Sequence, residues 1–278
     1  MEKKVINLHL ISDSTGETLS SVARAVLSQF EMVESNDFIW PLIRTKAQLD
    51  KVLEAIALKP GIVLYTVIND QLIEELRKAC FKLQLPCISV LSHIIAEFSS
   101  YLRLNINNMV GRQHLLDNEY FSRVDAISYT ITHDDGQSHW DLYEADVVII
   151  GVSRTSKSPT SVYLSCRGYK VANIPFVSIE TIPPVIYELK KPLIVGLVIN
   201  PEKLIQIRQS RLASIGQHDM TTKYIDIEAI KEEVAESRKL FAKLNCPVID
   251  VTKRSVEETS AKIIQLIQEM KLNSKSLN

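Results

Sequence analysis

The chain has 278 residues, of which 46% are apolar and 23% are charged, and its formal net charge is −1. This composition is usual for a soluble globular protein that is long enough for two domains. The near-zero charge excludes the global basic field of many nucleic-acid-binding proteins, and no apolar run is long enough to span a bilayer. The apolar run at the N-terminus is also too short for a signal peptide. We therefore expect no nucleic-acid partner, no membrane partner and a cytoplasmic location.

The four cysteines show no C-x-x-C spacing. Such a set is typical of reduced, mostly buried thiols in a cytosolic protein, and it does not favour a structural zinc site. They are Cys80, Cys87, Cys166 and Cys246.

The first part of the chain alternates strand patterns with amphipathic helix patterns. Strands are predicted at residues 5–11, 38–43, 62–67 and 86–90. Helices are predicted from the first loop to about residue 30, and at residues 46–58, 70–83 and 94–104. Four successive strand-and-helix units are typical of a parallel α/β sheet with helices on its faces.

A polar loop, S-D-S-T-G-E-T at residues 12–18, joins the first predicted strand to the first helix. A loop at a helix N-terminus offers unpaired backbone N–H groups to an anion. Ser14, Thr15 and Gly16 are therefore candidates for a phosphate or target-docking site. The alternative is a capping box, because Ser14 and Glu17 have its spacing. Both interpretations use the same N–H groups, and the sequence favours neither.

A polar interruption at residues 105–118 marks the exit from the first domain. We expect an N-terminal parallel α/β domain at residues 1–110 and a second domain at residues 111–278. Residues 119–132 fit a helix, although residues 127–131 alternate as a strand would.

The pentapeptide H-D-D-G-Q follows at residues 133–137. A turn is the simpler interpretation, because Asp-Gly sequences are common in turns. Two carboxylates beside an imidazole can also supply a general base or a metal contact, so His133, Asp134 and Asp135 are candidate catalytic residues. Asp134 is the favoured base, because the adjacent His133 could orient it. Residues 138–145 must then bring this motif back to the edge of the sheet where the next loop lies. Otherwise the aspartate must act from a neighbouring subunit.

The stretch D-V-V-I-I-G-V-S-R-T-S-K-S-P-T-S at residues 146–161 organises the second domain. Its β-branched, apolar start predicts a strand buried on both faces. The spacing G-x-x-x-x-S-K-S departs at one position from the phosphate-loop pattern G-x-x-x-x-G-K-[ST]. We expect Ser158 to cap the next helix and Pro159 to be its first residue. The simpler alternative is a strand, a polar turn and a capped helix without a ligand.

The residues of this loop are candidate nucleotide ligands. The N–H groups and the helix dipole favour phosphate, Lys157 would reach the outer phosphates, and the Ser158 hydroxyl would hold Mg²⁺. Ser156 occupies the position of a glycine, and its Cβ makes a positive φ more costly. The candidate set is Gly151, Val152, Ser153, Arg154, Thr155, Ser156, Lys157 and Ser158.

The remaining patterns complete a P-loop kinase-like α/β domain. Strands are predicted at residues 170–174, 193–199 and 247–251, and helical segments at residues 159–168, 183–189, 202–211, 227–244 and 256–270. Arg208 and Arg211 lead into the segment S-I-G-Q-H-D-M-T-T-K-Y. Loop arginines close over phosphates in many phosphotransferases. The alternative is a solvated basic helix end.

Three stretches are specific in this order: S-D-S-T-G-E-T, H-D-D-G-Q and G-V-S-R-T-S-K-S-P-T-S, with S-R-L-A-S-I-G further on. Over nearly its whole length, the chain resembles the bacterial and plant regulatory proteins of pyruvate, phosphate dikinase, whose relatives act on phosphoenolpyruvate synthase. Members usually have G-V-S-R-T-G-K-T-P-T-S, so Ser156 and Ser158 here replace a glycine and a threonine.

The resemblance implies a bifunctional enzyme that forms a homodimer and has the dikinase as its protein partner. It would phosphorylate a target threonine with ADP as donor, and remove that phosphate with inorganic phosphate, releasing pyrophosphate. The β-phosphate of ADP would lie over the N–H groups of residues 152–158, with Lys157 and Mg²⁺ on Ser158 neutralising charge. Asp134 or Asp135 would take the proton of the threonine.

Several alternatives stay open at this point. One phosphate site could serve both reactions, or residues 12–18 could form a second one. The target could be phosphoenolpyruvate synthase. The protein could instead be an ATP-dependent kinase of a small metabolite, or a nucleotide sensor without catalytic activity.

Overall fold

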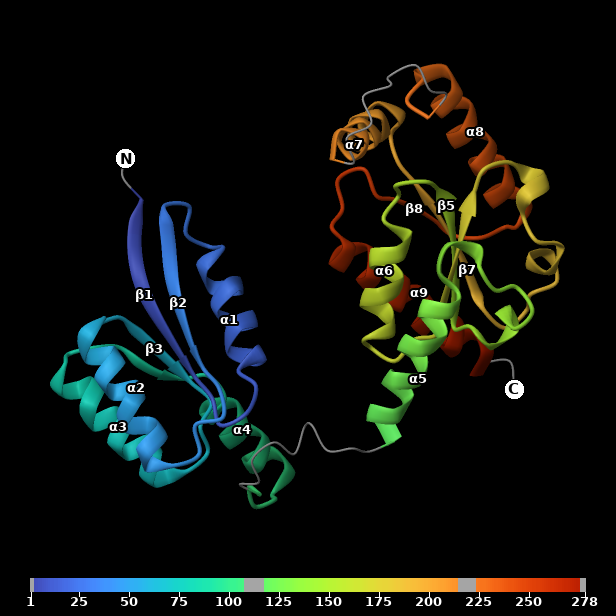
Figure 1. The fold of residues 1–278 in the computed structure, drawn as a ribbon. Coiled ribbons are helices and arrows are strands. Elements are labelled where there is room, and N and C mark those ends of the chain that lie inside the picture. Colours follow the sequence, from blue (N-terminus) through green and yellow to red (C-terminus); the bar gives the residue numbers. More distant parts are fainter. Residues whose placement is uncertain (1–2, 108–117, 215–223, 276–278) are drawn as a thin grey trace. The chain divides into compact units, whose positions relative to one another are not determined.

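The computed structural model describes residues 3–107, 118–214 and 224–275 (Figure 1). The chain divides into two compact units, residues 1–115 and 116–278, and in the described ranges each unit has one four-stranded parallel sheet. The predicted two-domain α/β class is confirmed. The predicted boundary between residues 110 and 111 lies outside the described residues and stays a prediction.

The first unit has the strand order β2-β1-β3-β4. Its strands are β1 (Lys4–Ile11), β2 (Val33–Trp40), β3 (Ile62–Tyr65) and β4 (Cys87–Ser89). Its helices are α1 (Glu17–Leu27), α2 (Lys46–Leu58), α3 (Asp70–Lys82) and α4 (Ser92–Leu102). The chain passes to one side of β1 for β2 and to the other side for β3. The carboxyl ends of β1 and β3 therefore flank the topological switch point, where open α/β sheets bind ligands.

Both faces of this first sheet are covered, because successive strand residues point to opposite sides. Leu10 and Leu64 pack in a cluster with residues of α1, whereas Ile11 and Tyr65 pack in a cluster with residues of α2 and α3. Strand β2 begins five residues earlier than the predicted residue 38. Its polar first half pairs with β1 as an edge strand, and such a strand carries little apolar signal.

The second unit has the strand order β6-β5-β7-β8. Its strands are β5 (Val147–Val152), β6 (Val171–Phe176), β7 (Leu193–Val198) and β8 (Val248–Asp250). Its α-helices are α5 (Asn118–Thr132), α6 (Lys157–Ser165), α7 (Pro201–Ser214), α8 (Ile227–Lys243) and α9 (Val256–Lys275). Short 3₁₀ turns are η2 (Asp134–Gly136), η3 (Leu142–Glu144), η4 (Ile179–Thr181) and η5 (Pro184–Tyr187).

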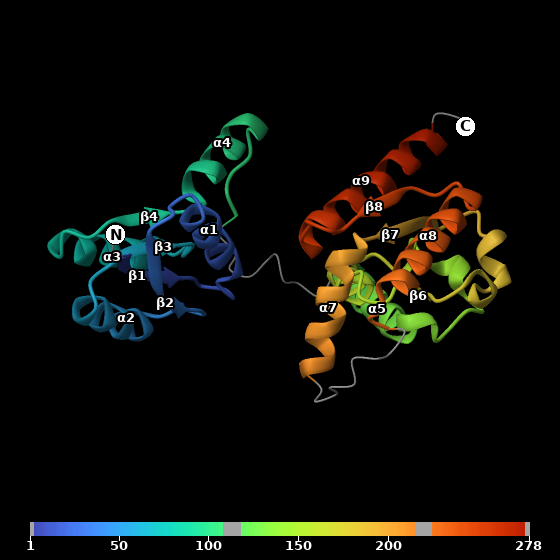
Figure 2. The same cartoon turned by 90° about the horizontal axis from the view of Figure 1, so that it is seen from above.

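Strand β5 lies in the middle of the second sheet, and all its residues are buried. Helix α6 packs beside α5 and α9 (Figure 1), while α7 packs on α8 (Figures 1 and 2). The switch point of this sheet lies between β5 and β7, so it receives the loop that precedes α6.

The structure corrects three local expectations. Residues 127–131 belong to helix α5 and are not a strand. The capping-box alternative for Ser14 and Glu17 is wrong, because the N-cap of α1 is Gly16, without a side-chain cap. Helix α6 begins at Lys157 with Ser156 as its N-cap, so Ser158 does not cap it. Pro159 is tolerated in the first turn because no N–H there needs an intrahelical partner.

In the parts of the chain that the structure describes, no helix is long and apolar enough to cross a membrane.

Candidate phosphate-binding site

The loop between β5 and α6 folds back tightly on its own strand. The Thr155 hydroxyl is buried and donates a hydrogen bond to the carbonyl of Val152 at 2.9 Å. A Cβ at Gly151 would lie 2.8 Å from the Thr155 Oγ1 atom and 2.9 Å from the carbonyl oxygen of Leu197 on β7. Only glycine therefore allows the loop to approach the sheet this closely.

The backbone of this loop contains two residues with left-handed conformations. Arg154 and Ser156 have positive φ values of 73° and 61°. Among the described residues, we find no acceptor for the N–H groups of Ser156, Lys157 and Ser158. These orphan donors lie at the positive end of the α6 dipole, where a phosphate oxygen would be stabilised. From the sequence we expected a positive φ to be more costly for serine than for glycine, and Ser156 has such a φ here.

Lys157 is unusually buried for a lysine, with 6% of its surface exposed. Its Nζ atom donates to the Val152 carbonyl at 3.2 Å. Burial lowers the pKa of Lys157 to about 8, and the carboxylates of Asp135, Asp134 and Glu233 oppose this shift. A buried ammonium group beside unpaired N–H donors needs an anion to compensate its desolvation.

The structure brings the H-D-D-G-Q motif to this loop within the same unit. Turn η2 packs on β6, whose residue Pro175 pairs with Gly151 of β5. Asn173 of β6 donates a hydrogen bond to the Asp134 carboxylate and accepts one from the Asp135 N–H at 3.1 Å. The partly buried Asp134 and the exposed Asp135 both interact electrostatically with Lys157. The motif itself thus lies beside the later residues of β6 within the same chain, and residues 138–145 lead from it back to the start of β5.

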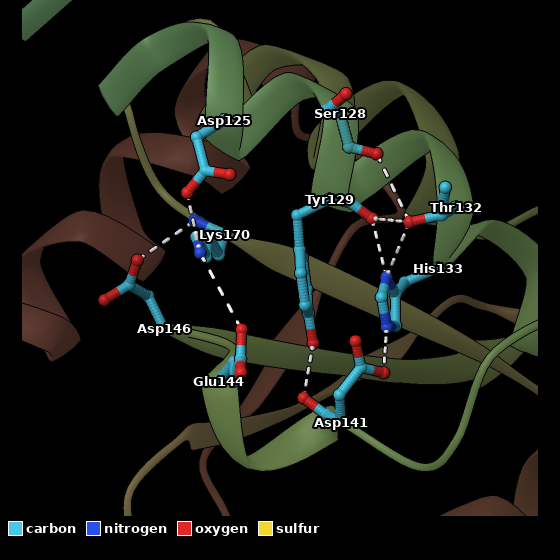
Figure 3. A network of polar contacts seen from close by, with 9 residues as sticks. All are labelled: Asp125, Ser128, Tyr129, Thr132, His133, Asp141, Glu144, Asp146 and Lys170. Atoms are coloured by element: carbon cyan, nitrogen blue, oxygen red, sulfur yellow. Dashed lines mark hydrogen bonds and ion pairs between the residues drawn. The ribbon is translucent and has the colours of Figure 1, made fainter. Parts of the chain in front are cut away.

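His133 has a different position from the one that we expected. Its Nδ1 atom lies 2.7 Å from the Tyr129 carbonyl, and its Nε2 atom lies 2.6 Å from the Asp141 carboxylate. Figure 3 shows the imidazole stacked beside the Tyr129 ring, and the Tyr129 hydroxyl donates to the Asp141 carbonyl. Because both ring nitrogens are engaged, His133 anchors the start of the motif, while Asn173 orients Asp134.

Arg208 is buried below the loop, with 2% of its surface exposed. Its guanidinium group donates to the Ser153 carbonyl at 3.3 Å and to the Tyr224 carbonyl at 3.1 Å, and pairs with Glu233 at 2.9 Å. Burial raises the pKa of Glu233, and the charge of Arg208 opposes that shift. The solvated helix end that we considered for Arg208 is therefore wrong, whereas Arg211 is exposed on the last turn of α7.

Few protein groups at this loop could serve as ligands of Mg²⁺. The Ser158 hydroxyl is half-buried and has no partner among the described residues. No group of three or more His, Cys, Asp or Glu residues that could hold a metal occurs in the described parts of the chain. This set fits Mg²⁺ that is bound together with nucleotide phosphates, which supply most of its oxygen ligands. The other predicted phosphate residues, Ser14, Thr15 and Gly16, lie at the switch point of the first sheet.

Sequence reasoning missed three residues that shape the site. Asn173 is a buried polar residue in a strand of apolar neighbours, and that contrast was the available signal. Glu233 is one of several glutamates on α8, and Asp141 is one of several acids before β5, so neither had a distinguishing signal.

Comparison with known proteins identifies a matching family and relatives that are named as regulatory proteins. A family model described as kinase/pyrophosphorylase matches residues 8–264. A Caulobacter vibrioides protein is 47% identical over 94% of this chain and 82% of its own length. Proteins from Rhizorhabdus wittichii and a Bradyrhizobium species are each 48% identical, over 95% and 94% of this chain and 96% and 93% of their own lengths. All three are named as regulatory proteins of pyruvate, phosphate dikinase.

Among solved structures, a solute-binding protein of an ABC transporter from Agrobacterium vitis aligns with 13% identity and a TM-score of 0.23, over 89% of this chain and 91% of that chain. That score is too low to support an argument. The family match covers most of the chain and agrees with relatives of nearly half-identical sequence. This chain therefore belongs to the kinase/pyrophosphorylase family.

Proposed function

We propose that this protein is a bifunctional regulator of pyruvate, phosphate dikinase. It phosphorylates a threonine of that enzyme with ADP as donor, which inactivates the target. It removes the phosphate with inorganic phosphate as acceptor, which releases pyrophosphate and reactivates the target. The names of the relatives and the family description support the regulator and its two reaction types. We further propose that it acts in the cytoplasm as a homodimer.

The main structural support for this proposal is the environment of Lys157. A buried lysine lies at the start of a helix whose first N–H groups lack partners, at the switch point of a parallel sheet. Such a site is suited to the terminal phosphate of a nucleotide. The β-phosphate of ADP would accept hydrogen bonds from the N–H groups of residues 152–158 and lie against the Lys157 ammonium group. When bound, Mg²⁺ on Ser158 would neutralise further phosphate charge.

Two aspartates are candidates for the general base that accepts the threonine proton. The Asp134 carboxylate is held by Asn173, so its orientation is defined. The Asp135 carboxylate is exposed and has the larger electrostatic interaction with Lys157 of the two. Both carboxylates interact electrostatically with Lys157, which would contact the transferred phosphoryl group, and this supports a role for either of them as the base. For the reverse reaction, inorganic phosphate would attack phosphothreonine, and the same carboxylic acid would return the proton to the leaving hydroxyl.

Three other functions make different experimental predictions. The target could be phosphoenolpyruvate synthase, the enzyme could phosphorylate a small metabolite with ATP, or the protein could sense nucleotides without catalysis. The test is incubation with each purified dikinase-type enzyme and ADP that carries a labelled β-phosphate, with labelled ATP in parallel. We expect label on a threonine of pyruvate, phosphate dikinase from ADP. Transfer from ATP alone, or nucleotide binding without transfer to either protein, would contradict the proposal.

A further inference from the structure

Two of the four cysteines meet in the first unit. Cys80 lies in the last turn of α3 with 1% of its surface exposed, whereas Cys87 begins β4 and is partly exposed. Both side chains belong to the apolar cluster that β3 forms with α2 and α3. Six residues separate them in the sequence, which is not the spacing of a C-x-x-C motif, so the sequence pattern did not single them out.

The backbone holds the two cysteines on either side of a short reversal of the chain. The Leu85 N–H donates to the Cys80 carbonyl at 2.9 Å, which ties the connection to the end of α3. The Val63 N–H of β3 donates to the Pro86 carbonyl at 2.9 Å, directly before Cys87. Both ends of the connection are therefore fixed by hydrogen bonds.

The two thiols interact directly through a side-chain hydrogen bond. Because Cys80 donates to the sulfur of Cys87, this bond lowers the pKa of Cys87 and raises the pKa of Cys80. Burial opposes the shift of the Cys87 pKa, and the positive charge of Arg77 reinforces it. A partly exposed sulfur that ionises readily thus lies in contact with a buried thiol, which is the arrangement of an attacking and a resolving cysteine.

The other two cysteines have different surroundings. Cys246 is partly buried, its thiol donates to the Phe241 carbonyl at 3.7 Å, and burial raises its pKa. Cys166 is exposed at the C-cap of α6. Among the described residues, we find no contact of either one with another thiol. The chain therefore carries its own reference thiols, one exposed and one in a core.

We propose that Cys80 and Cys87 are a redox-active pair that hydrogen peroxide converts reversibly into a disulfide. The Cys87 thiolate would attack one peroxide oxygen, so that an S–O bond forms, the O–O bond breaks and the leaving hydroxide becomes water. The Cys80 sulfur would then attack the Cys87 sulfenic acid, and the departing hydroxide would take the Cys80 proton. Two thiols lose two electrons in total, and one peroxide is reduced to two molecules of water.

The connection between the two cysteines can accommodate the new bond. A disulfide is shorter than a hydrogen bond between thiols, so the two sulfurs must move closer together. Residues 81–84 are exposed, and a surface connection of this kind adjusts more easily than a packed core. This inference concerns the first unit alone and does not rest on the proposed function.

The test uses the full-length wild-type protein, so it does not depend on the folding of a variant. After treatment with hydrogen peroxide, free thiols are blocked with iodoacetamide and the protein is digested with trypsin without reduction. Trypsin cuts after Lys82, so Cys80 and Cys87 fall in separate peptides, residues 79–82 and 83–103. Mass spectrometry should find these peptides linked, with a mass two hydrogen atoms below their sum, and dithiothreitol should separate them.

The exposed Cys166 calibrates the dose, because peroxide is raised until this reference thiol is oxidised. We expect the link between Cys80 and Cys87 to form before that point, and Cys166→Ser should form the same link at the wild-type rate. The proposal is overturned if the two peptides are still unlinked when Cys166 is oxidised. It is also overturned if Cys87 is linked to Cys166 or Cys246 instead.

Two substitutions of Cys80 test the role of its hydrogen bond. Both should leave Cys87 as a sulfenic acid that dimedone traps, but Cys80→Ser keeps a donor whereas Cys80→Ala does not. Loss of one hydrogen bond to a charged group lowers the thiolate fraction about tenfold, and the greater nucleophilicity of a more basic thiolate recovers about threefold. Cys87 should therefore react about threefold more slowly in Cys80→Ala than in Cys80→Ser. Equal rates in these two variants, both shown to be folded by thermal unfolding, would overturn the assignment of Cys87 as the attacking thiolate.

Discussion

Asn173 in strand β6 donates a hydrogen bond to the carboxylate of Asp134, which precedes it by 39 positions in the chain. This contact ties an acidic turn to the sheet that carries the phosphate loop. The contact gives a structural reason for this pair of aspartates, which would otherwise be interpreted as part of a common surface turn. It also means that mutations can separate the roles of the two residues.

We expect one of the two aspartates to be the general base. Asp134→Asn and Asp135→Asn should each fold and bind ADP, since the asparagine side chain keeps a similar shape and Asp134→Asn can still accept from Asn173. The variant that lacks the base should transfer phosphate about a hundredfold more slowly. Transfer rates and ADP affinity should be measured for each variant. Wild-type rates in both would place the base outside this motif.

Lys157→Ala should abolish transfer and weaken ADP binding, because the buried ammonium group would neutralise the transferred phosphate. Lys157→Met should have the same effect on transfer while raising the stability of the nucleotide-free protein, since it removes a desolvated charge and keeps the apolar stem. Denaturant unfolding with and without ADP measures both effects. A folded Lys157→Ala protein with near-normal transfer would refute the assignment of the loop.

The pH dependence of the free protein follows from the same lysine. Its pKa is lowered from 10.5 to about 8, so the folded chain releases this proton earlier than the unfolded chain does. Between these values the unfolded state binds more protons, and the free energy of unfolding should therefore rise with pH. ADP affinity should fall over the same range, because a neutral lysine attracts phosphate less. Both trends should be absent in Lys157→Met. Equal pH trends in the two proteins would assign the titration to another group.

Ser156→Gly should stabilise the free protein. A left-handed residue with a Cβ costs about 1–2 kcal/mol, and glycine loses part of that gain through a more flexible unfolded chain, which leaves about 0.5–1 kcal/mol. ADP affinity should be kept or improved. Gly16→Ala, at the equivalent left-handed N-cap of α1, should be destabilising and serves as the opposite control. A large loss of ADP affinity in Ser156→Gly would show that the serine hydroxyl contacts the nucleotide.

The buried pair of Arg208 and Glu233 should be costly to break from one side. Arg208→Met leaves a desolvated carboxylate and should destabilise the fold by about 3–5 kcal/mol. Adding Glu233→Leu to it should restore much of that loss, since no unpaired charge then remains. Thermal unfolding of the two single variants and the double variant forms the required cycle. Additive losses in the double variant would mean that the two side chains are not energetically coupled.

The local pattern of apolar and polar residues was sufficient to predict most of the fold. The β-branched run at residues 147–150 specified a strand buried on both faces, and alternating strand and helix patterns specified parallel sheets, because burial sets the periodicity of the sequence. Helix starts were less reliable. Ser158 has the chemistry of a cap, but the loop turns at Ser156 because Thr155 bonds back to the strand, and this bond is a tertiary detail.

The sequence by itself determined that a lysine-bearing loop with nearly the phosphate-loop spacing follows a central strand, because residue spacing along one strand-loop-helix unit is a local property. Only the tertiary structure decided which distant groups face that loop. Strand β6 brings Asn173 and the two aspartates beside it, and the fold buries Arg208 with Glu233 beneath it. Such neighbours depend on the order of strands in the sheet, which no local spacing encodes.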